Sequence, residues 1–198
     1  MSTQIKVVGL GGSLAPASKS LAALKIALDA AAEAGAAIEL FDIRALNLPM
    51  FTPGTGEAPA PARRLAEAAC QAAGLIWSSP LYHGTISGSF KNALDWLQIL
   101  ADHDPPYLTD KVIGLISTAG GVQGLQAVNT MEFAVRALRG WAVPMVQPIP
   151  RAWEIFAEDG SVRAPVVAEQ LRALGREVVR AARQFATTGA CDYSSARV

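Results

Sequence analysis

The sequence predicts an α/β protein in which one parallel sheet is covered by helices on both faces. Three observations support this fold class. Short apolar runs typical of buried strands alternate with helix-like segments five times along the 198 residues, as in a doubly wound sheet. Loops rich in glycine and hydroxyl side chains follow several strands. No internal repeat or linker divides the chain, so we expect a single domain.

The first elements are two strands around one helix. Residues 5–10 are an apolar run that leads into a glycine turn, and residues 37–42 alternate apolar and polar side chains, so both predict strands. Between them, residues 18–35 are rich in alanine and leucine and end at Gly35, which predicts a helix that ends at this glycine.

The middle of the chain begins with a long predicted loop. Three prolines and two glycines lie within residues 43–60, and such residues favour turns over regular structure. A helix is expected over 61–73, with proline at its start, where the missing N–H costs little. An apolar run predicts a strand over 74–79, and helical spacing predicts a helix over 86–101.

The last part of the chain repeats the alternation. Apolar runs predict strands over 111–117 and 142–147, with a helix over 122–139 between them. Residues 163–187 place apolar side chains mostly three and four positions apart, which predicts an amphipathic helix. Ligands bind at the carboxyl ends of the strands in doubly wound sheets. We therefore expect the functional site in the loops after the first, third and fourth strands.

Composition limits the domain organisation and the function classes. Small polar residues dominate the end of the chain, so we expect one domain over 1–187 and a disordered tail over 188–198. Seventeen Lys+Arg balance seventeen Asp+Glu, which argues against nucleic-acid and membrane partners. No signal peptide is evident, and Cys70 and Cys191 do not make a disulfide framework. We therefore expect a reducing, cytoplasmic location.

The loop over residues 9–20 has the composition of a phosphate-binding loop. The dinucleotide fingerprint fits at Gly9 and Gly11 but fails at Leu14, and the P-loop pattern meets serine at both of its glycine positions. A mononucleotide loop, in which hydroxyls and amides surround the phosphate, needs no fixed glycines. Three serines suit that role: Ser13, Ser18 and Ser20. Ser18 also fits as a helix N-cap, and both roles are compatible.

A longer motif follows the third predicted strand, at residues 78–97. The segment resembles the NADPH-dependent FMN reductase family, whose pattern is S-P-x-Y-H/N-G-x-x-x-G-x-x-K-N-A-x-D/E-W. The matching residues are Ser79, Pro80, Tyr82, His83, Gly84, Gly88, Lys91, Asn92, Ala93, Asp95 and Trp96. Segments 12–19 and 119–121 also resemble the family, and the resemblance covers residues 5–147.

The resemblance implies a flavodoxin-like fold, a three-layer sandwich with five parallel strands in the order 2-1-3-4-5. It also implies FMN as cofactor and NADPH or NADH as co-substrate. The flavin phosphate is expected at the first loop and the ring at the loops after the third and fourth strands. The implied cofactor-binding residues are Ser13, Ala15, Ser18, Lys19, Ser20, Pro80, Leu81, Tyr82, His83, Gly84, Thr118, Ala119, Gly120 and Gly121.

Several of these residues have plainer alternative roles. Ala15 stands where many family members carry arginine, so either Lys19 supplies the charge or its side chain points to solvent. Tyr82 fits a core aromatic as well as a flavin contact. His83 fits a structural loop imidazole, and the turn at 119–121 fits a plain tight turn.

Three helix surfaces carry further expectations. Lys91 and Asp95 are four apart and should form an ion pair. An apolar face follows, which is either core or, as the resemblance suggests, partly a dimer interface beside the flavin; it comprises Trp96, Leu97 and Leu100. Four arginines of the last predicted helix either attract the phosphates of NADPH or form a solvated face with nearby glutamates, which we prefer. They are Arg172, Arg176, Arg180 and Arg183.

The implied function is transfer of a hydride from NADPH to FMN and of electrons onward to a small acceptor, such as free flavin or a quinone. Because the cofactor carries this chemistry, we assign no catalytic residue. We assign no metal site, since neither His83 nor His103 has a ligand-spaced partner. A homodimer or homotetramer with the flavin near its interface is expected. A flavodoxin-type electron carrier and a Rossmann NAD(P)-binding oxidoreductase are the alternatives.

Overall fold

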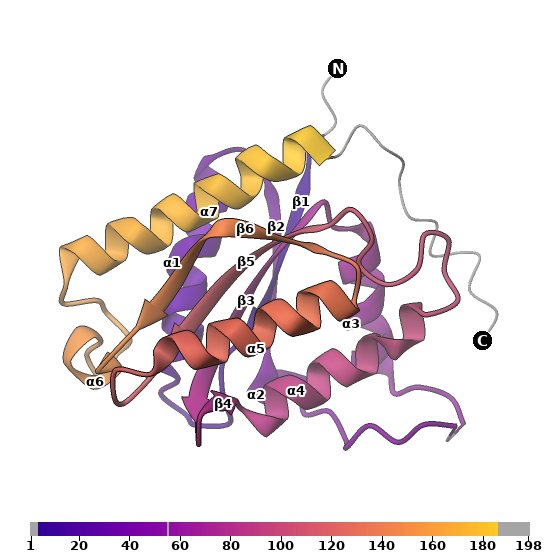
Figure 1. The fold of residues 1–198 in the computed structure, drawn as a ribbon, viewed down its shortest axis with the longest axis horizontal. Coiled ribbons are helices and arrows are strands. Elements are labelled where there is room, and N and C mark those ends of the chain that lie inside the picture. The colour runs from indigo at the N-terminus through magenta and orange to yellow at the C-terminus, as the bar shows by residue number, and fades with distance from the viewer. Residues whose placement is uncertain (1–3, 55, 186–198) are drawn as a thin grey trace.

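A computed structural model describes residues 4–54 and 56–185 (Figure 1). Its main sheet is parallel, in the order β2-β1-β3-β5-β6, and a short β4 pairs antiparallel with β3. The strands are β1 (Lys6–Gly11), β2 (Ala37–Asp42), β3 (Gly74–Tyr82), β4 (Thr85–Ile86), β5 (Val112–Thr118) and β6 (Trp141–Ile149). The predicted flavodoxin-like topology is confirmed. The predicted order 2-1-3-4-5 corresponds to the observed order, because the short β4 raises the numbers of the last two strands by one. The predicted tail at 188–198 lies outside the described residues.

Helices cover both faces of the sheet, as predicted. The helices are α1 (Lys19–Glu33), α2 (Ile43–Leu46), α3 (Ala60–Gln71), α4 (Gly88–Asp95), the 3₁₀ segment η1 (Trp96–Leu100), α5 (Gly124–Ala137), α6 (Ala152–Ile155) and α7 (Pro165–Phe185). Figure 1 shows α1 and α7 side by side, away from α3, α4 and α5. One apolar core lies between the sheet and α1 with α7, and a second lies under α3, α4 and α5.

The structure corrects the predicted elements in three places. The helix predicted over 86–101 begins at Gly88, because a β3–β4 hairpin precedes it, and becomes 3₁₀ at Trp96. The strand predicted over 74–79 continues to Tyr82. The short helices α2 and α6 were not predicted, because four residues show no helical periodicity.

The apolar face after α4 is core. Trp96, Leu97 and Leu100 are all buried within this chain. The Trp96 indole nitrogen donates to the Pro49 carbonyl at 2.9 Å, and the ring meets Phe51 edge-on at a centroid distance of 5.2 Å. These three side chains therefore follow the core alternative, and the chain's own loop covers Trp96.

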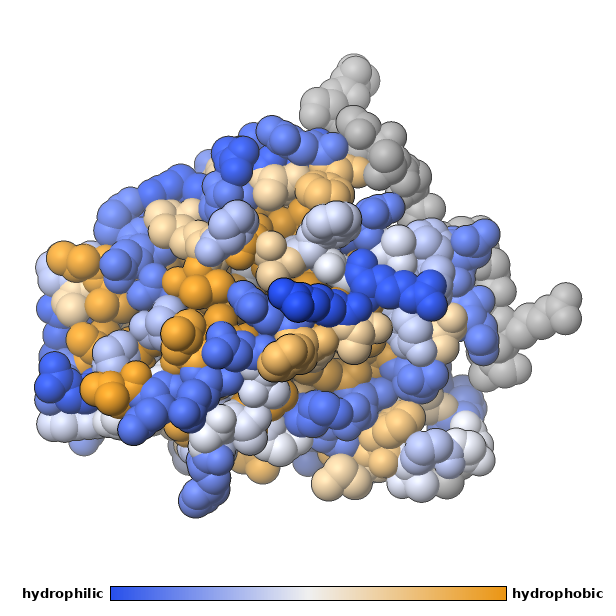
Figure 2. All heavy atoms as spheres, viewed as in Figure 1, coloured by the Kyte–Doolittle hydropathy of each residue, from blue (hydrophilic) through white to orange (hydrophobic). Residues whose placement is uncertain are grey.

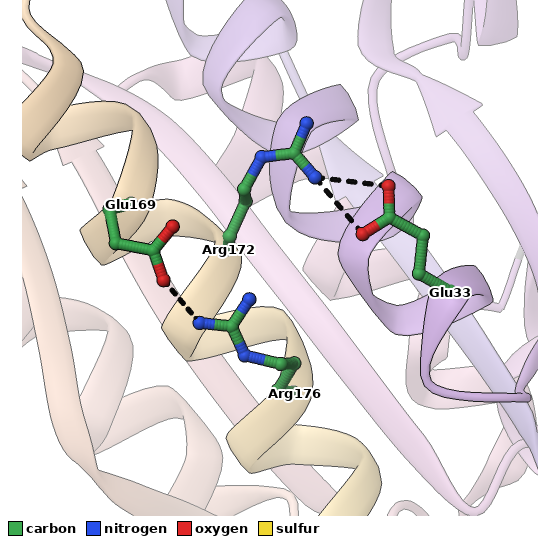
Figure 3. Close-up of polar contacts among 4 residues, drawn as sticks. All are labelled: Glu33, Glu169, Arg172 and Arg176. Atoms are coloured by element: carbon green, nitrogen blue, oxygen red, sulfur yellow. Dashed lines mark hydrogen bonds and ion pairs between the residues drawn. The ribbon is translucent and has the colours of Figure 1, made fainter.

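The arginines of α7 are paired, as expected for a solvated face. Arg172 contacts both carboxylate oxygens of Glu33 at 3.0 Å, and Arg176 pairs with Glu169 (Figure 3). Further along the helix, Arg180 pairs with the neighbouring Glu177. The remaining arginine, Arg183, donates to the carbonyl of Ala34 after α1. Arg172 and Arg183 therefore link α7 to α1 and the residue after it, whereas the other two arginines pair within α7.

Two further observations concern the expected location. Cys70 is buried in α3 and disulfide-bonded, although no disulfide framework was expected from the sequence. Cys191 lies outside the described residues. No helix in the described part of the chain has both the length and the apolar character to cross a membrane.

Candidate functional site

A pocket of about 260 Å³ lies at the carboxyl ends of β1, β3 and β5. The site lies beside β1, where the strand order reverses, and doubly wound sheets bind their ligands at such a point. The lining residues are Ser13, Ala15, Ala17, Ser18, Lys19, Ser20, Pro80, Leu81, Tyr82, Thr118, Ala119, Gly120, Ala152 and Trp153. Eleven of these fourteen belong to the site predicted from sequence.

The loop after β1 offers the groups that bind a phosphate. Ser18 is the N-cap of α1, as predicted, and its hydroxyl accepts from the Leu21 amide at 3.3 Å. The buried Ser13 hydroxyl accepts from the Ala15 amide at 3.3 Å. Lys19, half-buried at the start of α1, has no ion pair within the described residues. Hydroxyls, a helix N-terminus and an unpaired cation thus gather on one wall.

Ser20 has a different role from the other two serines. Its buried hydroxyl lies 2.6 Å from that of Thr118, at the end of β5. Its carbonyl accepts a hydrogen bond of 2.8 Å from the Ser78 hydroxyl. Ser20 therefore ties the loop after β1 to the neighbouring strand ends, and its hydroxyl is already engaged.

The family motif after β3 divides into a pocket part and a structural part. Pro80, Leu81 and Tyr82 line the pocket, and Tyr82 is 50% exposed. His83 and Gly84 both have positive φ, at 50° and 86°, and form the two-residue turn of the β3–β4 hairpin. Neither of these two residues lines the pocket.

The later motif residues hold a loop in place. The side-chain amide of Asn92 donates to the Pro49 carbonyl at 2.9 Å and accepts from the Phe51 amide at 2.8 Å. Lys91 and Asp95 form the predicted ion pair at 2.5 Å. The Asn92 contacts lock part of the long 43–60 loop against α4, so this half of the motif acts through packing and not through the pocket.

The loop after β5 leaves room for a flat ligand. Gly120 lines the pocket, and a Cβ added there would meet no atom within 4 Å. By contrast, a Cβ on Gly11 would lie 2.4 Å from the Ser78 carbonyl oxygen, so that glycine serves packing. Gly121, predicted as a contact, does not line the pocket. Open space at Gly120 next to phosphate-type donors fits the FMN that the fold implies.

Three lining residues escaped the sequence analysis: Ala17, Ala152 and Trp153. The last two follow β6, whose carboxyl end meets the same sheet edge. The strand prediction ended this strand at 147, whereas β6 continues to Ile149. Loops at the carboxyl ends of the strands bind ligands in such sheets. The loop after this strand is one of them, so its position in the sequence is a signal for both residues.

Known proteins of one enzyme family resemble this chain. Residues 5–154 match the family model of NADPH-dependent FMN reductase. The chain is 28% identical over 159 residues to NADPH-dependent FMN reductase ArsH of Acidithiobacillus ferrooxidans, covering 80% of this chain and 65% of that protein. It is 37% identical over 111 residues to an FMN-dependent NADPH-azoreductase of Staphylococcus aureus, covering 54% and 56% of the two chains.

Solved structures show the same fold. The flavoenzyme FerB from Paracoccus denitrificans, an NAD(P)H:(acceptor) oxidoreductase, superposes with a TM-score of 0.73 at 22% identity, covering 91% of this chain and 98% of that one. The chain spans between about half and two thirds of the length of the curated relatives it matches. Because the family model matches most of the chain, and the pocket lies within the matched part, the chain belongs to the NADPH-dependent FMN reductase family.

Proposed function

We propose that this protein is an FMN-dependent oxidoreductase that takes a hydride from NADPH or NADH and passes electrons to a small acceptor. One observation carries the proposal: phosphate-type donors and the open space at Gly120 line the same pocket, in a chain of this family. Two curated relatives are named as an FMN reductase and an FMN-dependent azoreductase. Their names support the cofactor and the reaction class for this chain.

In this proposal each loop binds one part of the flavin. Ser13, Ser18 and Lys19, with the amides at the start of α1, hold the phosphate, whose charge the helix N-terminus stabilises. Pro80, Leu81 and Tyr82 would hold the ring from one side, and segment 118–120 would hold it from the loop after β5. Bound FMN supplies the hydride-accepting chemistry. The protein binds and orients the ring, and no side chain acts as a general acid or base.

The resemblance to the FMN reductase family implies an assembly of several chains. We therefore propose a homodimer or homotetramer with the flavin near the interface. The acceptor is a small molecule such as free flavin, a quinone or an azo compound.

The decisive experiment combines flavin binding with NADPH oxidation. Purified protein mixed with FMN should bind it, shift its visible absorption and oxidise NADPH when an acceptor is added. Gly120→Val should abolish FMN binding without lowering the unfolding midpoint, because the added side chain has open space on the pocket side. Gly88→Val is the matched control, since Gly88 also has no atom near its Cβ position but lies in α4, outside the pocket.

Two outcomes would contradict the proposal. A wild-type protein that binds no FMN would refute it outright. A protein that binds FMN but oxidises neither NADPH nor NADH with any small acceptor would instead be a flavodoxin-type electron carrier, which shares the fold and the cofactor. Binding of NADPH without any flavin would support the Rossmann alternative.

A further inference from the structure

Trp153, in α6, is a large aromatic side chain left 60% exposed on the pocket wall. The other tryptophans have partners or are buried. Trp77 and Trp96 lie in the core, and Trp141 packs on Phe185 at a centroid distance of 5.5 Å. Within the described residues, Trp153 makes no ring contact and no hydrogen bond through its side chain. An unpartnered indole on a pocket wall offers its face to a ligand.

The backbone under Trp153 is fixed to the loop after β5. The Ala152 amide donates to the Ala119 carbonyl at 2.9 Å, and the Arg151 amide donates to the Gly121 carbonyl at 3.2 Å. Ala152 and Phe156 are buried on either side. These contacts hold the start of α6 next to the loop that carries Gly120, so the indole does not sit on a free surface segment.

The neighbouring walls are apolar and aromatic. Pro80, Leu81 and Tyr82 line the same pocket as Trp153. Figure 2 shows further apolar side chains gathered at the α6 end of the molecule, and the exposed Val122 and Leu125 follow the loop after β5. A phosphate needs donors and cations, which lie on the wall formed by the loop after β1. The wall at Trp153 instead suits a flat aromatic ring.

We propose that Trp153 binds the flavin ring directly, through its indole face. This inference rests on the proposed function and adds a residue from the loop after β6, outside the family motif. It predicts that flavin affinity depends on an aromatic side chain at 153 and not only on the three loops that the motif identifies.

The test is a fluorescence titration of FMN into four proteins. Relative to wild type, Trp153→Leu should weaken FMN binding roughly fivefold to tenfold, as expected for loss of one aromatic contact. Trp153→Phe should stay within about twofold, because a ring remains. Flavin bound to Trp153→Leu should also emit more strongly, because indole contact quenches flavin emission. Trp141→Leu is the control, since Trp141 is 55% exposed at the other end of β6 and does not line this pocket.

The outcomes distinguish a failure of this inference from a failure of the proposed function. Wild type that binds no FMN refutes the proposed function, and this inference falls with it. Wild type that binds FMN while Trp153→Leu binds equally well, with equally quenched emission, overturns the role of Trp153 alone. Equal losses in Trp153→Leu and Trp141→Leu would also overturn it, because the effect would not depend on the pocket.

Discussion

Cations and close contacts differ between the α1–α7 layer and the pocket edge of the sheet. Arginines of the first region have ion-pair partners, and the cation of the second, Lys19, has none among the described residues. Along α7, Arg172 and Arg180 pair with carboxylates, and Gly175 brings the backbone of α7 against that of α1. At the pocket, Lys19 has no ion pair within the described residues, and Trp153 has no ring partner there. A row of arginines is therefore weak evidence for a phosphate site when each arginine already has a partner.

The largest effect should come from the close contact in the α1–α7 layer. A Cβ on Gly175 would lie 2.0 Å from the Ala27 carbonyl oxygen, and backbone cannot move aside as a side chain can. Gly175→Ala should therefore lower the free energy of unfolding by about 3 kcal/mol, measured by urea denaturation. FMN affinity of the folded fraction should stay unchanged, because the contact is remote from the pocket.

The matched control is Gly88→Ala, a substitution of an exposed helical glycine whose Cβ position is open. It should leave stability unchanged or raise it by up to about 1 kcal/mol. A Gly175→Ala protein as stable as Gly88→Ala would contradict the close packing of α7 on α1.

A buried cation gives the next effect. Lys111 donates to the Cys70 carbonyl at 2.6 Å, and burial lowers the pKa of its ammonium to about 8, although nearby Asp110 acts to raise it. Between pH 8 and its ordinary value of 10.5, the unfolded lysine holds a proton that the folded one has lost. Stability should therefore rise with pH in that window. Below pH 8 the full cost of the buried charge is present.

Urea midpoints of wild type and Lys111→Met at pH 7.5, 8.5 and 9.5 would show this. The stability of wild type relative to the variant should increase by roughly 2 kcal/mol across the series. The exposed Lys25 supplies the control, because Lys25→Met should give no pH-dependent difference. A constant difference for Lys111→Met would mean that its ammonium is not desolvated.

The bond that joins two loops of the pocket should have a smaller effect. Ser20→Ala leaves the buried Thr118 hydroxyl without its 2.6 Å partner and should cost about 1–2 kcal/mol of stability. Thr130→Ala is the matched control, because Thr130 and Thr85 form an exposed hydroxyl pair at 3.1 Å. Thermal unfolding of both variants would show the difference, and equal losses would mean that the Ser20 bond is no more important than a surface one.

The sheet and most of the pocket could be predicted because the sequence features that indicate them lie close together in the chain. The alternation of apolar and polar side chains over 37–42 predicted β2 at its observed bounds. Loops at strand ends carry the pocket residues, and the motif after β3 marked Pro80 and Tyr82 directly. These features depend on residues close together in the chain, and a single sequence displays them.

The missed features depend on contacts between distant residues. The Ser20–Thr118 bond joins positions 98 apart, and no local pattern distinguishes Ser20 from its neighbouring serines. The apolar face at Trp96 could not show whether its cover is the chain's own loop or a second chain. Trp153 follows β6, which was predicted to end at 147 but continues to Ile149. The sequence prediction therefore did not place Trp153 at the edge of the sheet.

The smallest expected effect concerns the cations of the two regions and their contribution to FMN binding. Lys19 is proposed to face the flavin phosphate, so Lys19→Ala should weaken FMN binding roughly fivefold at low ionic strength, and less at high salt. Arg180→Ala should leave the dissociation constant within about twofold, because this arginine already pairs with Glu177. Riboflavin, which lacks the phosphate, should bind wild type and Lys19→Ala equally well. A similar loss for riboflavin would show that Lys19 supports the pocket wall and does not bind the phosphate.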